Sequence, residues 1–487
     1  MKNHIVQVVD RARQGFKRTR SGSISASQVV LVPPELWLQI FSYLTTSGEL
    51  KAVSLTCTCF RQLAQPLLFS KISTHPAPPP LALRGIQTNK YRRRTSQRLE
   101  FFLSPLIAPA VRECWIHPPS AEDDDLPTDV LIDAIFDGLR KLPNLKVLGC
   151  QSIRLTPKRL AVLHGLALTT VTLESCPSDV VDFTHQPVLP LCSVTFKYHD
   201  PPSRDVFLAP LLSLFLAPRH LQRLSATTPE ILLALTLRRP FARLTHLDLP
   251  VDCLSPTNVD SLVAALSHTP ALERITLHTD PDGGGRPYPR APALPPLLLP
   301  HLKAYRGPRN YAALFAGAGR LSTVELSLPA KAHRLLRTLG QIQAQVQFQQ
   351  SHTPVELDFL SFRVDGHVPL GFLQNVHTLL PALRTLSIND PAVAPASLQA
   401  LLAETSPCPN IRMFRIRVEG RDRYNLWVPP VEEAADAVEC FNKVRTEIDR
   451  VYPSLWALKL LYGVEGGAVV WKRDAVTGQL VQVTVLQ

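Results

Sequence analysis

The chain has 487 residues, of which 45% are hydrophobic and 19% are charged, so it can form two or three domains, or one small domain and a repeat array. No stretch of about 18 apolar residues is free of both charge and proline, which argues against a membrane span and a membrane partner. The nine cysteines are scattered and the N-terminus has no apolar signal core, so we expect a reduced protein of the cytoplasm, the nucleus or both.

The formal net charge of +12 is concentrated in two short segments. Residues 1–28 contain six Lys or Arg and one acidic residue, and residues 84–98 contain six Lys or Arg and no acidic residue. The first segment predicts a disordered basic tail. Its Arg-rich, acid-poor composition is also typical of a mitochondrial transit peptide, and this alternative stays open.

Residues 29–73 predict a small domain of three short helices. Pro33 and Pro34 suit a first helical turn, and Glu35 favours the positive end of the helix dipole. Apolar residues follow at helical spacing in two series, which are Leu36, Ile40, Phe41 and Leu44, and then Leu50, Val53, Leu55, Cys57, Phe60 and Leu63. A unit of about 40 residues rarely buries a sufficient core by itself. Its surplus apolar surface therefore predicts a docking module.

This segment resembles the F-box motif. The matching positions are Val32, Pro33, Glu35, Ile40, Leu44, Leu50, Val53, Cys57 and Phe60. Val32, Glu49, Thr56 and Phe60 depart from the usual residue types, and the hydroxyl of Thr56 could weaken a contact that is commonly aliphatic. The resemblance implies that these nine positions bind a Skp-type adaptor and, through it, the cullin scaffold of an SCF-type ubiquitin ligase. A generic helical hairpin that caps a larger domain is the alternative.

Residues 74–98 predict a linker in which a proline-rich stretch precedes the basic one. The cations of residues 90–98 could bind nucleic-acid phosphate, which would make the chain a nucleic-acid-associated repeat protein. Tyr91 is the only aromatic residue among them and no recognised nucleic-acid fold surrounds them. We therefore do not expect nucleic acid to be the main partner.

Residues 99–465 carry an internal repeat with the spacing L-x-x-L-x-L, in which any large apolar residue can stand for leucine. The copies start at Leu145, Leu168, Leu191, Leu244, Leu272, Leu321, Leu357, Leu383, Ile411 and Leu455, with weaker copies at Val111, Leu221 and Leu302. From Leu145 to Leu455 the spacing averages about 28 residues, which is typical of leucine-rich repeats.

Each copy predicts a strand, because its second and third leucine-type residues share one face at a period of two. Helical patterns begin between copies near Thr156, Thr228 and Ser255. The chain therefore resembles an irregular leucine-rich-repeat solenoid, an α/β fold with parallel strands inside and helices outside. Only Cys176 and Asn310 stand where that family places a residue that bonds the turn. A generic leucine-rich α/β domain is the alternative.

Two segments interrupt or end this array. The stretch from Pro281 to Pro296 is too rich in Pro and Gly for a helix or a central strand, and it predicts a surface loop. Residues 466–487 alternate in polarity around Thr477 and predict a β-hairpin that caps the solenoid.

The sequence contains no P-loop, H-E-x-x-H, G-x-S-x-G or paired C-x-x-C motif. We expect no catalytic residue, no cofactor and no metal site, and we expect the chain not to be an enzyme. Function must then come from binding.

The solvent-facing positions of the predicted strands are mildly basic. The residues that we expect to bind a protein client are Arg223, His246, Arg274, Arg306, Arg415 and Lys459. Because Arg forks match carboxylate and phosphate, the client would be acidic or phosphorylated. A solvated strand surface is the alternative. The sequence thus favours a non-catalytic substrate receptor of an SCF ligase over a nucleic-acid-associated protein or a protein-interaction scaffold outside any ligase.

Overall fold

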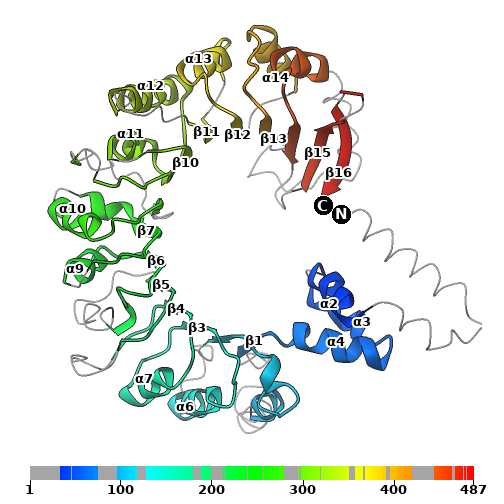
Figure 1. Ribbon diagram of the computed structural model, residues 1–487, viewed down its shortest axis with the longest axis vertical. Coiled ribbons are helices and arrows are strands. Elements are labelled where there is room, and N and C mark those ends of the chain that lie inside the picture. Colours follow the sequence, from blue (N-terminus) through cyan, green and yellow to red (C-terminus); the bar gives the residue numbers. More distant parts are fainter. Residues whose placement is uncertain are drawn as a thin grey trace, which may run out of the picture. The chain divides into compact units, whose positions relative to one another are not determined.

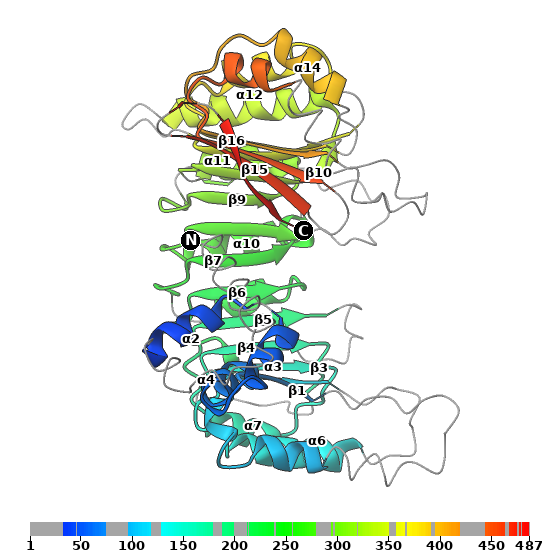
Figure 2. The same cartoon turned by 90° about the vertical axis from the view of Figure 1, so that its right-hand side faces the viewer.

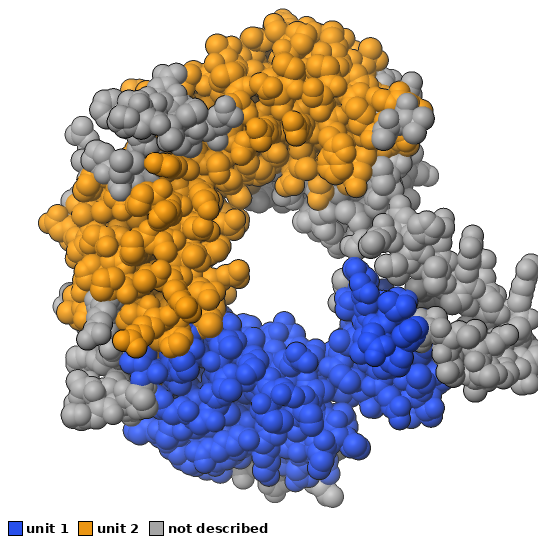
Figure 3. Space-filling model, viewed as in Figure 1, with its two compact units in different colours: residues 1–191, 202–207 blue, residues 192–201, 208–487 orange. Residues whose placement is uncertain are grey.

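The computed structural model comprises two compact units, residues 1–191 with 202–207 and residues 192–201 with 208–487 (Figure 3). It describes residues 33–44, 46–74, 96–117, 128–178, 188–198, 212, 214–237, 240–255, 257–278, 294–295, 298–318, 320–349, 357–365, 368–390, 395–418, 444–462, 467–474, 477–478 and 480–486. The predicted tail, Val32, nearly all of the predicted linker and most of the loop that starts at Pro281 lie outside these ranges.

Unit 1 begins with the three predicted helices, α2 (Pro34–Ser42), α3 (Ser47–Ser54) and α4 (Thr58–Leu68). Local chemistry explains their starts. Pro34 occupies the first turn of α2. Before α3, Thr46 and Glu49 form a reciprocal capping box in which each side chain accepts a backbone N–H at 3.2 Å. Before α4, the Cys57 Sγ accepts the Phe60 N–H at 3.4 Å.

The sheet of unit 1 consists of β1 (Lys71–Thr74), β2 (Glu113–Ile116), β3 (Val147–Gln151) and β4 (Thr170–Glu174), which pair in parallel in chain order. The other described elements of this unit are a helix over residues 96–102, η3 (Ala108–Ala110), α6 (Thr128–Leu139) and α7 (Pro157–His164). The predicted helix start at Thr156 is correct, since the Thr156 hydroxyl caps α7. Strand β1 was not predicted. Only two residues separate the end of α4 from β1. The segment in which the sequence predicted three helices therefore also contains the first strand of this sheet.

The sheet of unit 2 has ten parallel strands in chain order, followed by an antiparallel hairpin (Figure 1). The parallel strands are β5 (Ser193–Lys197), β6 (Arg223–Ala226), β7 (His246–Pro250), β8 (Arg274–His278), β9 (Ala304–Gly307), β10 (Thr323–Ala330), β11 (Phe359–Val364), β12 (Thr385–Asp390), β13 (Met413–Val418) and β14 (Ala457–Tyr462). The hairpin strands are β15 (Gly467–Arg473) and β16 (Leu480–Leu486).

Helices of unit 2 line one face of this sheet, as Figures 1 and 2 show. They include α9 (Ile231–Thr236), η4 (Val251–Leu254), α10 (Val259–Ser267), α11 (Arg309–Ala318), α12 (Ala332–Gln349), α13 (Phe372–Leu379), α14 (Pro395–Ala403) and a helix over residues 444–451. Among the described residues, no helix combines the length and the apolar character needed to cross a membrane.

The repeat pattern locates the strands correctly. Every copy coincides with one strand, from the weak copy at Val111, which gives β2, to the copy at Leu455, which gives β14. In β7 the alternation is clear, because Leu247 and Leu249 are fully buried while His246 and Asp248 are half-buried. The predicted α/β class, with three N-terminal helices before a solenoid-like array of parallel strands and helices, is confirmed.

Details of the repeats depart from the pattern. The helices expected near Thr228 and Ser255 begin three and four residues later, at Ile231 and Val259. Of the two predicted turn-bonding residues, Cys176 bonds the backbone of the preceding repeat, since its Sγ donates to the carbonyl of Cys150 in β3 at 3.3 Å. The prediction for Asn310 is wrong, because Asn310 is exposed in the first turn of α11.

The C-terminal strands pair as a β-hairpin. Strand β15 is antiparallel to both β14 and β16. The turn between β15 and β16 contains Thr477, as predicted. The Thr477 N–H donates to the Asp474 carboxylate at 2.8 Å, and Gly478 adopts a positive φ of 65°. The domain boundaries that we drew from the sequence stay predictions.

Candidate functional site

The helical cluster α2–α4 has a very small core. Among residues 33–69 that the structure describes, only Phe41, Ser54 and Ala64 are buried. The centre of the cluster is aromatic, because the Trp37 ring lies 4.7 Å from that of Phe60 and 5.8 Å from that of Phe41. The rings of Phe41 and Phe60 meet edge to face at 5.3 Å. These contacts set the arrangement of α2 and α4 but leave Leu36, Tyr43 and Leu55 exposed.

The predicted adaptor-binding residues divide into two groups. The half-buried group is Ile40, Leu44, Leu50, Val53 and Phe60, and the exposed group is Pro33, Glu35 and Cys57. Phe60 therefore contributes to the core of the cluster as well as to its surface. Val32 lies outside the described residues.

Sequence reasoning missed part of the apolar surface. The side chains of Leu36, Tyr43 and Leu55 are 49%, 41% and 67% exposed, although none of the three was predicted to bind the adaptor. Trp37 was also missed, and its indole N–H is buried with no hydrogen-bond partner in the described part of the chain. The helical spacing contained Leu36 and Leu55, but spacing alone does not show which apolar residues the cluster leaves uncovered.

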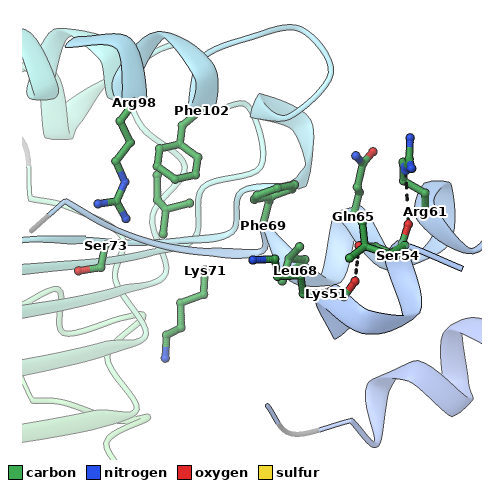
Figure 4. Close-up of a pocket in the computed structure, with 12 residues that line it drawn as sticks. Lys51, Ser54, Arg61, Gln65, Leu68, Phe69, Lys71, Ser73, Arg98 and Phe102 are labelled. Atoms are coloured by element: carbon green, nitrogen blue, oxygen red, sulfur yellow. Dashed lines mark hydrogen bonds between the residues drawn. The ribbon is translucent and has the colours of Figure 1, made fainter. Parts of the chain in front are cut away.

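A hollow of about 610 Å³ lies in unit 1 where α3 and α4 meet β1 and the helix over residues 96–102 (Figure 4). Four cations line it, Lys51, Arg61, Lys71 and Arg98. The Lys71 ammonium pairs with Glu113 at 2.8 Å. The Arg98 guanidinium lies over the Phe102 ring at 5.6 Å. Arg98 is the last residue of the predicted basic stretch and the only one of its cations that the structure describes.

A second hollow, of about 570 Å³, lies on the exposed strand face of unit 2. Four of the predicted client-binding residues line it, Arg223, His246, Arg274 and Arg306. Hydroxyl residues, a second histidine, one carboxylate and three apolar residues complete the lining, namely Ser193, Thr195, Ser225, Thr276, Ser327, His278, Asp248, Val194, Leu224 and Leu277. The chain segments involved come from β5 to β10, so the parallel register of these strands builds the hollow.

The two remaining predicted client residues do not line this hollow. Arg415 on β13 and Lys459 on β14 are direct register partners. The Arg415 guanidinium lies 6.0 Å from the centre of the Phe359 ring, and its Nε is 3.2 Å from the Met413 Sδ. The predicted basic face therefore consists of two separate groups of cations.

The charges around the second hollow are only partly balanced. Arg306 Nε lies 3.7 Å from Glu325 Oε2, a loose and exposed pair. Next to β8, Glu273 bonds Lys303 at 2.9 Å, and this bond lowers the pKa of the Glu273 carboxyl. Asp248 is the acidic residue that lines the hollow itself. Three arginines thus face one carboxylate in the lining.

Burial lowers the pKa of His246 below its usual range, and the nearby Arg223 and Arg274 lower it further. Asp248 and Glu273 oppose this effect but do not overcome it. His246 is therefore neutral at pH 7 in the free protein.

Among the described residues, the possible metal ligands are dispersed and several of the cysteines are buried. No group of three or more His, Cys, Asp or Glu among them could hold a metal ion. Burial raises the pKa of Cys114 and of Cys176 to about 12, so these thiols are protonated and unreactive at neutral pH.

Comparison with known proteins gives one specific match. A model of the F-box-like family matches residues 30–75, which contain α2, α3, α4 and β1, so an F-box-like domain is present there. No curated protein matches the chain. Among solved structures, the crystal structure of the TLR13–ssRNA13 complex shows a loose likeness, with a TM-score of 0.28 and 14% identity. It covers 73% of this chain, and this chain spans about half (51%) of that one.

Proposed function

We propose that the chain is the non-catalytic substrate-recognition subunit of an SCF-type, cullin-based ubiquitin ligase. The observation that carries the proposal is the F-box-like match at residues 30–75 on a helical cluster that exposes the large side chains of Leu36, Tyr43 and Leu55. F-box domains typically bind Skp-type adaptors, and such an adaptor would cover this surface and link the chain to the cullin scaffold. The protein would then act in the cytoplasm, the nucleus or both.

Adaptor binding would complete the core that α2–α4 lack. Burying an exposed leucine-sized side chain contributes about 1.5 to 3 kcal/mol. Leu36, Tyr43 and Leu55 are large and 41 to 67% exposed, so their burial would contribute part of the free energy of binding, and other contacts must offset the rest of the cost of association. Ile40, Leu44, Leu50 and Val53 are half-buried and would lose their remaining exposure in the same interface.

The client would bind the strand face of unit 2. In such a ligase the receptor holds the client amine near a ubiquitin thioester, and the rate gain comes from proximity because a bimolecular step becomes effectively unimolecular. The chain needs no nucleophile for this role. The cations on the strand face favour an acidic or phosphorylated client.

Adaptor capture by the purified full chain tests the proposal. Changing Leu36 to Glu should reduce capture of a Skp-type adaptor at least tenfold, since a charge would enter an apolar interface. The matched control is Leu237→Glu, because Leu237 is also exposed, at 72%, but belongs to α9's C-cap in unit 2. Equal capture by the two variants would rule out docking through α2.

A second test concerns two residues at predicted F-box motif positions. Ile40→Ala or Leu44→Ala should each remove about 2 to 5 kcal/mol of packing that is complete only in the complex. Circular dichroism of the free variants would separate loss of binding from loss of helices. If both variants keep full affinity for the adaptor, the F-box positions are assigned wrongly.

Client recognition has its own test. Changing Arg223, Arg274 and Arg415 together to Glu should abolish co-purification of the client while the adaptor is retained. Purification with mass spectrometry would report adaptor, cullin and client at once. A ligase-independent scaffold would instead yield partners without a cullin, and a nucleic-acid-associated protein would show binding that weakens steeply with salt.

A further inference from the structure

Two arginines flank a histidine in the hollow of unit 2. Arg223, His246 and Arg274 stand in one register row on the neighbouring strands β6, β7 and β8. Neighbouring strands lie about 4.8 Å apart, so the Cα atom of each arginine lies about one strand spacing from the Cα atom of His246. All three side chains line the hollow.

The next row adds further donors. Ser225, Asp248, Thr276 and Arg306 follow one another in register on β6 to β9 and also line the hollow. The lining therefore offers three guanidinium forks and several hydroxyls against one carboxylate. A phosphoryl dianion, with three oxygens and a charge near −2, can accept more of these donors than a carboxylate can.

The hydrogen bonds of His246 decide which of its nitrogens carries the proton. The Thr245 hydroxyl donates to the Gln222 carbonyl at 3.1 Å, so its proton is already used. His246 Nδ1 lies 2.9 Å from the same hydroxyl oxygen and must therefore be the donor of that contact. In the neutral ring, Nε2 then carries a lone pair rather than a proton.

We propose that this hollow is a phosphoryl-binding subsite in which an oxyanion binds together with a proton on His246 Nε2. The inference rests on the proposed client-recognition role of this face and names the chemistry that it recognises. A bare lone pair would repel the anion. Uptake of one proton from solvent converts Nε2 into an N–H donor, so the bound state gains one hydrogen bond and one positive charge.

The groups that face His246 give the direction of the pH effect. Arg223 and Arg274 disfavour its protonation, while Asp248 and the Lys303-paired Glu273 favour it. A bound dianion would offset the two arginines and raise the affinity of the ring for a proton. By linkage, the anion must then bind more tightly as the pH falls from 7.5 to 5.5.

Sulfate is the sharpest probe, because it stays a dianion over this whole pH range. Calorimetric titration of the full chain with sulfate should show a Kd that falls about fivefold or more between pH 7.5 and pH 5.5. In His246→Gln the dependence of the Kd on pH should be largely lost, whereas His278→Gln, which removes the other histidine of the lining, should keep it. In Arg274→Gln the Kd should be about tenfold higher at every pH. Arg363→Gln is the matched control, since Arg363 is a half-buried position on β11 that does not line the hollow, and it should bind sulfate like the unmodified chain. A pH-independent Kd in the unmodified chain, or unchanged binding in Arg274→Gln, would overturn the proposal.

Two further ligands distinguish the source of the phosphoryl group. A capped phosphothreonine peptide that binds more tightly than inorganic phosphate would identify a phosphorylated client, and equal affinities would identify free phosphate as the ligand. The unphosphorylated peptide is the control, and no binding of either phosphoryl probe would overturn the subsite. Adaptor capture measured on the same variants keeps the two proposals apart, because loss of anion binding with intact capture contradicts only this inference.

Discussion

The helices α2–α4 and the strands β6–β8 bury their apolar residues in different ways. In the strands, Leu224, Leu247 and Ile275 are 0 to 1% exposed, because each repeat is covered by its neighbours and by the helices of the same unit. In the helices, Leu36 and Leu55 keep about half of their surface or more in solvent. The apolar residues of the repeats are covered within the chain, whereas the helical cluster leaves large apolar side chains in solvent, as expected if a partner subunit covers them.

The prediction with the largest expected effect compares one leucine from the strands with one from the helical cluster. Leu247→Ala should lower the free energy of unfolding by about 2 to 5 kcal/mol, since it leaves a cavity in a fully buried layer. Leu36→Ala should change it by about 0.5 kcal/mol, because half of that side chain is already in water. Urea unfolding followed by circular dichroism measures both. Similar losses in the two variants would mean that the helical cluster is as well packed as the repeats.

A buried histidine tests whether the core of the repeats excludes water. The Nε2 of His377 on α13 lies 3.1 Å from the hydroxyl of Tyr452, and its ring is 7% exposed. Burial lowers the pKa of His377 from 6.5 to about 4. The unfolded chain therefore binds the proton first, and stability that is fully present above pH 6.5 is lost as the pH falls towards 4.

The expected loss through His377 is about 3 kcal/mol, from about 1.4 kcal/mol per pKa unit. His377→Gln keeps a polar partner for Tyr452 but does not titrate. The difference in urea stability between the two proteins should therefore shrink by about 3 kcal/mol from pH 7 to pH 4. A difference that does not change with pH would show that water reaches this part of the core.

The difference between the strands and the helical cluster also explains which features could be predicted from the sequence. Strand positions follow from alternation within six residues, so the copies at Leu244 and Leu272 locate β7 and β8 correctly. Strand β1 was missed because, within Lys71–Thr74, Ile72 is the only large apolar residue and no leucine pattern marks it. Its strand character comes from pairing with β2, a long-range effect.

The candidate sites were less predictable than the strands. Arg223, His246 and Arg274 were found from the alternation, but the hollow that they share depends on the register of strands separated by loops of different length. Ser193 and Ser327, at its edges, lie far apart in the sequence, so no local pattern groups them. The exposure of Leu55 was equally hidden, since helical spacing does not say which side of a three-helix cluster lacks a cover.

The last prediction concerns the capping box of α3. Thr46→Ala removes the side chain that accepts the Glu49 N–H, and such a loss costs about 1 kcal/mol of helix stability. If the helices of the cluster are stabilised by the adaptor, binding must supply part of the lost helix stability. The affinity for the adaptor should then be up to about fivefold lower. Thr46→Ser keeps the cap and should bind within about twofold of the unmodified chain. Hydrogen exchange of α3 in the free protein is the second measurement. Faster exchange with unchanged adaptor affinity would mean that the helices are stable enough alone, and the proposed dependence on a partner subunit would fail.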